Sequence, residues 1–320
     1  MKSSVRRVGL LAALTASAAL VLSACGGGDI DSSSGSGGDC KETVNMAINP
    51  WVGFEASAHV VGRVIEQKLG CKVDYKNLKE EVAWQGFGKD VDVIIEDWGH
   101  PDLEKKYVKS ANPTAVDLGE NGNVGQIGWF VPPWMAKKYP DITDWKNLNK
   151  YADLFKTSES GGKGQLLDGD PSFVTNDEAL VKNNKLDYKV VYAGSEAALI
   201  TAFRQAEKNK KPLLGYFYEP QWFLSEVELV KVDLPKYTPG CDADAEKITC
   251  DYPETKLKKF VAKKFADSDS DAFKVVKNFS WTNDDQNLVA KYIAEDKMSA
   301  DEAADKWIKA NQDKIKAWLP

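Results

Sequence analysis

Histidine is scarce in this chain, which contains 2 histidines among 320 residues. The sequence also lacks a His-Glu-x-x-His metal motif and the Gly-x-Ser-x-Gly turn of many hydrolases. The adjacent acids Glu96 and Asp97 are the best remaining acid–base pair, but neighbouring residues of a strand point to opposite faces. We therefore predict no catalytic residue, no metal site and no cofactor, and a protein that is not an enzyme.

A basic patch and a membrane-spanning segment are also missing. The net charge is −6, and an acidic chain without clustered lysines or arginines argues against a nucleic-acid partner. The one long apolar run covers residues 8–21. About 14 apolar residues are too few to cross the ~30 Å hydrocarbon core of a bilayer.

That apolar run follows Lys2, Arg6 and Arg7 and precedes the sequence Leu22-Ser23-Ala24-Cys25. A basic start, a short apolar stretch and small residues are typical of a secretory signal peptide. The Leu-Ser-Ala-Cys box predicts a bacterial lipoprotein signal over residues 1–24, with Cys25 as the lipidated first residue; the alternative is an ordinary signal peptide with a chance cysteine. Residues 25–39 are rich in Gly, Ser and Asp and predict a flexible tether. We expect a protein anchored by lipid on the extracytoplasmic face of the cell membrane.

Four cysteines remain after the tether, at positions 40, 71, 241 and 250. An even number in an oxidising compartment favours disulfides. Three pairings are possible; a Cys40–Cys71 bridge would join neighbouring predicted strands, and a Cys241–Cys250 bridge would close a short polar loop. Each bridge would contribute ~2–4 kcal/mol.

Strands alternate with helices along the first hundred residues of the folded part. Apolar runs predict strands at 44–48, 71–75 and 91–95, and helical periodicity predicts helices at 55–69 and 80–87. This alternation is typical of βαβ units with a parallel sheet, whose ligands bind beyond the carboxyl ends of the strands. The residues that follow these ends are therefore candidates for a site.

The rest of the chain repeats the alternation before turning helical. Residues 125–133 predict a crossing between two lobes, residues 213–218 an apolar strand, and residues 230–234 a return crossing. From about residue 256 the pattern predicts mainly helices, including one over 303–319.

Aromatic residues gather at the predicted strand ends. The chain has 10 tryptophans, and core packing explains a buried ring such as Trp145, Trp281, Trp307 or Trp318. A second group stands at or near strand ends: Trp51, Trp98, Trp129, Phe173 and Tyr218. Several rings around one cavity form a cage for a quaternary ammonium group, which has no N–H and binds π-faces at ~0.5–2 kcal/mol per ring.

A possible anion site accompanies this group. Residues 169–178 lead into a helix predicted to begin near Asp177, and backbone N–H groups at a helix start bind anions. Amides near Val174 and Thr175 would then hold a carboxylate while Phe173 contacts the ammonium group of the same zwitterion. Ordinary capping of the helix by Thr175 or Asn176 is the alternative.

Four segments, in order, resemble the glycine betaine-binding proteins of ABC importers, and the resemblance covers about residues 41–320. The segments are Ile-Ile-Glu-Asp-Trp-Gly-His ending at His100, Asp-Pro-Ser-Phe-Val-Thr ending at Thr175, Tyr-Phe-Tyr-Glu-Pro-Gln-Trp ending at Trp222, and the closing stretch 307–319. The resemblance implies cage positions at Trp98, Phe173 and Tyr218, with Trp51 and Trp129 as further walls. His100 lies near a ligand-contacting histidine of the family, whereas His59 is expected to be structural.

The same resemblance implies a two-lobed α/β fold of the type II periplasmic-binding-protein class. We expect lobe 1 to comprise residues 40–128 and 234–320, and lobe 2 residues 129–233, with ligand bound between them. The protein would bind glycine betaine or a related quaternary ammonium compound and deliver it to the membrane permease of an ABC importer, for uptake of a compatible solute. Two alternatives remain: the same fold binding choline, carnitine or ergothioneine, or an aromatic-lined lipoprotein that binds sugar.

Overall fold

The computed structural model describes residues 40, 42–173 and 175–320. The predicted signal peptide, the lipidation site Cys25, the tether and the predicted contact residue Val174 lie outside the described residues. The described residues from 40 onward belong to one compact unit, residues 36–320. In this part of the chain, no helix combines the length and the apolar character needed to cross a membrane.

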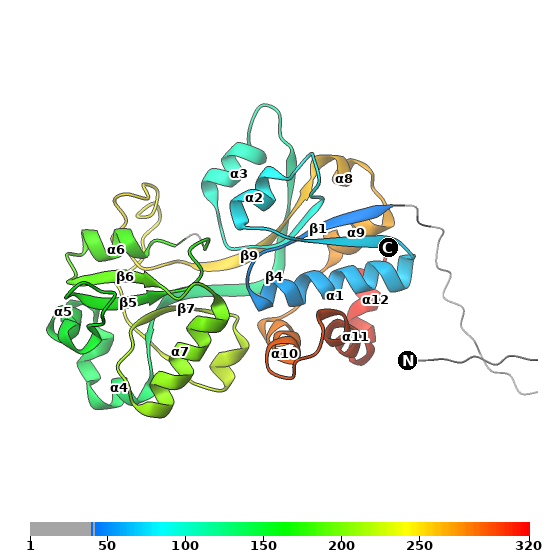
Figure 1. Cartoon of the computed structure of the whole chain (residues 1–320). Helices are drawn as coiled ribbons and strands as arrows, with labels where there is room; N and C mark the ends of the chain where they lie inside the picture. Colours follow the sequence, from blue (N-terminus) through cyan, green and yellow to red (C-terminus); the bar gives the residue numbers. More distant parts are fainter. Residues whose placement is uncertain (1–39, 41, 174) are drawn as a thin grey trace, which may run out of the picture. The chain divides into compact units, whose positions relative to one another are not determined.

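A mixed sheet of nine strands organises the described residues (Figure 1). Its order is β2 (Lys72–Asn77), β1 (Thr43–Ile48), β3 (Val93–Asp97), β9 (Glu254–Ala262), β4 (Ala115–Val131), β7 (Gly215–Glu219), β5 (Gly164–Asp168) and β6 (Tyr188–Tyr192), while β8 (Val230–Lys231) pairs with β4. Strand β1 runs parallel to β2 and β3, and β5 runs parallel to β6 and β7. We call these sets the first and the second strand group. The long strands β4 and β9 pair antiparallel between them.

Helix α1 (Val52–Leu69) covers the first strand group because one of its faces is apolar. Val60, Val61, Val64 and Ile65 are fully buried on that face. Gly70 ends the helix with φ 73°, a left-handed conformation that glycine adopts without steric cost. The helix begins three residues earlier than the periodicity predicts. The neighbouring connections form α2 (Glu80–Gln85) and α3 (Pro101–Tyr107).

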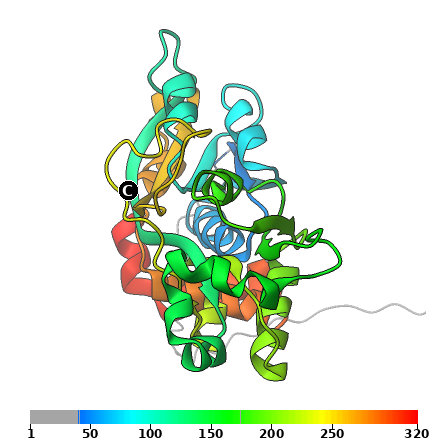
Figure 2. The same cartoon turned by 90° about the vertical axis from the view of Figure 1, so that its left-hand side faces the viewer.

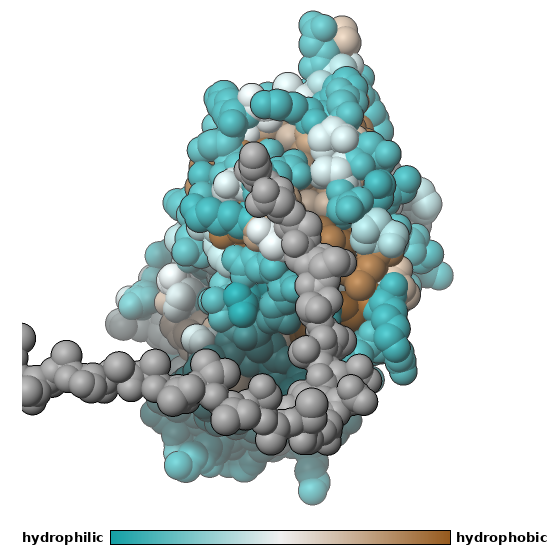
Figure 3. Space-filling view, turned by 90° about the vertical axis from the view of Figure 1, so that its right-hand side faces the viewer, coloured by the Kyte–Doolittle hydropathy of each residue, from teal (hydrophilic) through white to brown (hydrophobic). Residues whose placement is uncertain are grey.

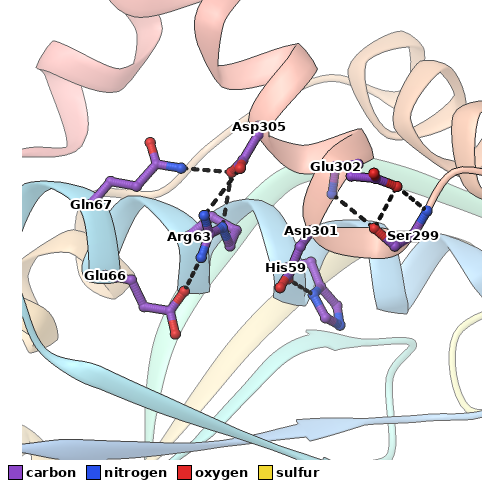
Figure 4. A network of polar contacts seen from close by, with 8 residues as sticks. All are labelled: His59, Arg63, Glu66, Gln67, Ser299, Asp301, Glu302 and Asp305. Carbon is purple, nitrogen blue, oxygen red and sulfur yellow. Dashed lines mark hydrogen bonds and ion pairs between the residues drawn. The ribbon is translucent and has the colours of Figure 1, made fainter. Parts of the chain in front are cut away.

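Helices from the end of the chain pack against α1. They are α9 (Asp271–Asn278), α10 (Asn283–Ala294) and α11 (Ala300–Ala310), followed by α12 (Gln312–Trp318). An ion pair and a further polar contact connect α11 to α1: Arg63 donates to Asp305 at 2.9 Å, and His59 contacts Asp301 at 2.7 Å (Figure 4). His59 also stacks on Tyr75, as expected for a structural histidine.

Helices also surround the second strand group. They are α4 (Pro133–Lys138), α5 (Leu148–Tyr151), α6 (Asp177–Asn183) and α7 (Glu196–Asn209), with short 3-10 turns at Pro140–Thr143, Trp145–Asn147, Ala152–Phe155 and Trp222–Ser225. Helix α7 begins with a cap, because the Ser195 hydroxyl accepts the backbone N–H of Ala198. Figure 2 looks nearly along the axis of α1 (blue), with the green segments of this group in front.

The last third of the chain is mainly helical, as predicted, but it differs from the prediction at two places. Residues 254–262 form β9 rather than a helix, and this strand is followed by the short helix α8 (Lys263–Asp267). Thr255 and the three lysines of β9 mask its strand pattern, although Leu257, Phe260 and Val261 are fully buried. The single helix predicted over 303–319 is two helices, α11 and α12, which meet at Asn311.

The predicted lobe limits remain a proposal, which the packing modifies at one end. Trp129 and Leu234 share a buried cluster with Ile248, Cys250 and Tyr252. The residues up to about 252 therefore pack with the second strand group, so we propose that lobe 2 extends past the expected limit at residue 233. The predicted crossing at 125–133 lies mostly in the C-terminal half of β4.

The four cysteines form two disulfides, in one of the three possible pairings. Cys40 is bonded to Cys71, with 4.8 Å between the Cα atoms, and Cys241 to Cys250, with 6.3 Å. The first ties the start of the folded chain to β2, and the second closes the loop before β9.

The visible face of the molecule in Figure 3 is mainly hydrophilic, with smaller hydrophobic areas between the polar ones.

Candidate functional site

A cavity of about 260 Å³ lies where residues of the two strand groups meet. Trp51 follows β1 and Trp98 follows β3, whereas Tyr218 belongs to β7 and Phe173 to the loop after β5. The carboxyl ends of strands thus supply the wall, as expected for a sheet of this kind. Seven aromatic rings line the cavity: Trp51, Trp98, Phe173, Tyr216, Tyr218, Tyr237 and Tyr252.

Five of these rings contact one another and form a continuous aromatic surface. The ring of Trp51 meets Phe173 edge-on at 5.6 Å between centroids, and Trp98 meets Tyr218 edge-on at 5.5 Å. Phe173 contacts both tyrosines of β7, Tyr216 at 6.3 Å and Tyr218 at 6.5 Å. Edge-to-face contacts are a favourable geometry for aromatic pairs. We call these five rings the cage.

A buried carboxylate holds the two tryptophans of the cage. One oxygen of Glu96, Oε1, accepts the indole N–H of Trp51 at 2.8 Å and that of Trp98 at 2.9 Å, and the Ser57 hydroxyl donates to the other oxygen at 3.0 Å. Burial raises the pKa of Glu96, and the indole hydrogen bonds oppose that rise. Glu96 and Asp97 are part of β3 rather than residues that follow it.

A second buried carboxylate accepts a hydrogen bond from a tyrosine of the cage. Glu196, the first residue of α7, accepts hydrogen bonds from the Tyr218 hydroxyl and the Gln221 side-chain amide. It also accepts the backbone N–H of Val52 at 2.9 Å. Burial raises the pKa of Glu196 to about 7.

His100 lines the cavity and is buried between two acids. Its Nδ1 lies 2.7 Å from Asp97, and its Nε2 lies 3.4 Å from Glu80, which also lines the cavity. Burial by itself lowers the pKa of His100, but the charge and hydrogen bond of Asp97 outweigh it and raise that pKa to about 9. The imidazole is therefore positively charged at neutral pH.

The loop predicted to bind an anion is partly occupied by internal contacts. Helix α6 begins at Asp177, as predicted, and Asn176 makes no side-chain capping bond. The Thr175 hydroxyl donates to Asp168 at 3.1 Å, and Thr175 is not part of the cavity wall. Asn176 does line the cavity, and its backbone N–H donates to the Tyr252 hydroxyl at 2.7 Å.

The expectation that Trp129 forms a wall of the cavity is corrected, because the structure places this residue away from the cavity wall. Its ring is buried in the second cluster, and its indole N–H donates to Asp177 at 2.7 Å. On β4 it pairs with Tyr216 of β7. The core role expected for other tryptophans is confirmed by the burial of Trp281, Trp307 and Trp318, and Trp145 packs half-buried against the second cluster.

Sequence reasoning missed several residues of the wall. Tyr216 stands two positions before Tyr218 on one strand, so the two-residue period of a strand was a signal for it. Tyr237, Asp242 and Tyr252 come from the long connection before β9, which has no periodicity that could have placed them.

The fold and the aromatic cavity define a ligand receptor rather than an enzyme. Residues 42–310 match the family described as the substrate-binding domain of ABC-type glycine betaine transport systems. The chain belongs to this family, as its sequence segments indicate. Members are extracytoplasmic substrate-binding receptors that work with ABC transporter permeases, so the prediction that this is not an enzyme is confirmed.

Individual relatives cover much of the chain. The trimethylamine N-oxide-binding protein of Pelagibacter ubique (strain HTCC1062) is 28% identical over 300 residues, which are 88% of this chain and 91% of the relative. The glycine betaine/carnitine transport binding protein GbuC of Listeria monocytogenes is 32% identical over 124 residues, 39% of this chain and 37% of the relative.

Solved structures confirm the expected two-lobed periplasmic-binding-protein fold. Lactococcal OpuAC in its closed, glycine betaine-bound form superposes with a TM-score of 0.69 at 22% identity, covering 87% of this chain and all of that one. A choline-binding protein of an ABC transporter, in complex with choline, gives 0.70 at 20% identity, with 86% and 91% covered.

Proposed function

We propose that this protein binds glycine betaine or a related quaternary ammonium compound in the cage and delivers it to the permease of an ABC importer. The observation that carries the proposal is the set of five contacting rings around one small cavity, with both indoles tied to a buried carboxylate. A group without N–H donors binds π-faces, and each ring contributes ~0.5–2 kcal/mol. Family membership supports the same class of ligand.

Roles for the individual residues follow from their positions. Trp51, Trp98, Phe173 and Tyr218 would surround the ammonium group, together with Tyr216. The positive charge of His100 and the side chain of Asn176, which makes no capping bond, lie in the same wall and would favour a ligand carboxylate. The backbone near Val174 and Thr175 would be a further anion contact.

The membrane attachment is also a proposal. Lipid on Cys25 and the tether of residues 25–39 would hold the receptor at the extracytoplasmic face of the cell membrane, near its permease. Family membership supports this side of the membrane. Metabolic labelling with a radioactive fatty acid checks the anchor: label should enter the wild-type protein and be absent from Cys25→Ala.

Calorimetric titration of the purified protein tests the ligand class. The panel is glycine betaine, proline betaine, choline, carnitine, ergothioneine and trimethylamine N-oxide, with glycine and maltose as controls. Micromolar binding restricted to methylated ammonium compounds is the expected result. Binding of maltose alone would favour the sugar alternative, and no binding to any methylated compound would refute the cage.

The ranking within that panel tests the carboxylate contacts. Glu80 and Asp242 also line the cavity, and acidic groups disfavour a ligand carboxylate. Tighter binding of choline or trimethylamine N-oxide than of glycine betaine would show that these acids outweigh His100 and Asn176.

A further inference from the structure

Glu96 is buried beside the cage without being part of its wall. The residue is 1% exposed, and the residues that line the cavity do not include it. Through one oxygen it nevertheless contacts both Trp51 and Trp98, which come from different connections of the fold. Glu96 therefore touches the ligand-facing rings at their edges, on the side away from their π-faces.

The donors around this carboxylate are neutral. In the described part of the chain, its hydrogen bonds come from Trp51, Trp98 and Ser57. The neutral side chain of Gln286 also lowers its pKa, and no ion pair among the described residues includes it. The nearby charged group from α7 is another acid, Glu196, which is itself influenced by the charge of Glu96. A buried carboxylate without a partner cation is costly, and its energy falls when a positive charge arrives close by. Burial raises the pKa of Glu96 for the same reason.

A carboxylate in this position acts on a cation in two ways. Its negative charge attracts the cation across a region of low dielectric constant. In addition, an N–H donated to a charged acceptor is strongly polarised, which makes the indole face more negative and strengthens cation–π attraction. Neither effect favours an uncharged group of the same size and shape.

We propose that Glu96 is a positioning residue that orients Trp51 and Trp98 and gives the cage its preference for a cation over a neutral group of equal shape. This inference rests on the proposed function and adds the origin of its charge selectivity. The ligand cation would supply the positive charge that is absent from the hydrogen-bond donors of Glu96.

Matched ligand pairs separate charge from shape. Choline and 3,3-dimethylbutan-1-ol differ by a quaternary nitrogen in place of a quaternary carbon, and so do glycine betaine and 3,3-dimethylbutanoate. The affinity ratio within each pair is measured by calorimetry for the wild type and for Glu96→Gln, whose amide oxygen still accepts the indole N–H groups. We expect the ratio to fall roughly tenfold, the effect of a charge interaction of ~1.4 kcal/mol, with the affinity for uncharged 3,3-dimethylbutan-1-ol nearly unchanged.

A control variant is available at the residue that precedes β3. Asp92→Asn also replaces a carboxylate by an amide, at a residue that accepts from Asn45 and does not line the cavity. Its ratio should equal that of the wild type. An unchanged ratio in Glu96→Gln, or an equal loss for both members of a pair, would overturn the inference.

A second measurement decides the matter if Glu96→Gln does not fold. In the wild type the affinity ratio should rise with pH, because the ionised carboxylate favours the cation. The same titration in Glu196→Gln, His100→Gln and Glu80→Gln removes each of the other nearby titrating groups in turn, and the rise should persist in all three variants. A ratio independent of pH would contradict the proposal. A wild type that binds no cation would instead refute the proposed function.

Discussion

The backbone N–H of Val52 donates a 2.9 Å hydrogen bond to the buried carboxylate of Glu196, although the two residues are 144 positions apart in the chain. Val52 is the first residue of α1, which covers the first strand group, and Glu196 is the first residue of α7, beside the second. The same carboxylate accepts the hydroxyl of Tyr218, a cage ring. One side chain therefore links the two strand groups to the cage.

Protonation of Glu196 should make the stability of the folded protein depend on pH. Burial raises its pKa to about 7, above the usual value of 4.5, so the folded protein binds a proton that the unfolded chain releases between these values. The corresponding stability is fully present below about pH 4.5 and is lost as pH rises through about 7, a change of up to roughly 3 kcal/mol. Thermal unfolding of the wild type and Glu196→Gln should show a smaller decline in the variant across this window. Parallel curves would contradict the assignment.

Removing a tryptophan of the cage should abolish ligand binding without unfolding the protein. Trp98 is only half-buried and contacts Tyr218 at the cavity. For Trp98→Ala we expect a loss of at least tenfold in affinity, since each ring contributes ~0.5–2 kcal/mol in addition to lost contact area. Calorimetry measures the affinity, and circular dichroism checks the fold. Trp145→Phe is a control at a ring away from the cavity, and unchanged affinity in Trp98→Ala would remove Trp98 from the site.

The two disulfides should differ in their effects on stability and on ligand binding. Cys40–Cys71 closes a loop of 31 residues and Cys241–Cys250 one of 9, so chain entropy predicts losses of ~3–4 and ~2–3 kcal/mol when each is removed. The shorter loop contains Asp242, and Tyr252 follows it; both line the cavity. Replacing Cys241 and Cys250 by alanine should weaken ligand binding more than replacing the other pair, while urea unfolding shows the opposite order. Equal effects on binding would count against this division.

His100 should remain charged well above neutral pH. The Asp97 carboxylate overcomes the effect of burial and raises the pKa of His100 to about 9 from 6.5. The stability from this ion pair is complete below about pH 6.5 and is lost as pH rises through about 9. Nitrogen-15 chemical shifts of the ring should report an imidazolium at pH 8. His100→Gln should flatten the loss of stability between pH 7 and 10, and a neutral ring at pH 7 would disprove the charge assignment.

Local patterns were enough for the elements of the first strand group. The apolar periodicity from Val60 to Ile65 and the glycine at position 70 place α1, and the short apolar runs place β1 and β3. The same rules missed β9, because lysines interrupt its apolar residues, and they joined α11 and α12 across Asn311. Periodicity cannot detect a strand whose exposed and buried faces are mixed in this way.

Only part of the cavity could be found from the chain alone. Four segments of the sequence indicated the class of protein by their resemblance to a family. Composition and local spacing predicted the alternation of strands and helices, the disulfide-forming cysteines and the aromatic residues at strand ends. The tertiary structure decided which rings meet: it brings Trp51, Trp98, Phe173, Tyr216 and Tyr218 to one cavity and buries Trp129 beside Asp177. It also decided that Glu96 and Glu196 lie behind those rings. Strand order and helix packing set the distances between residues far apart in sequence, and local sequence patterns do not predict these distances.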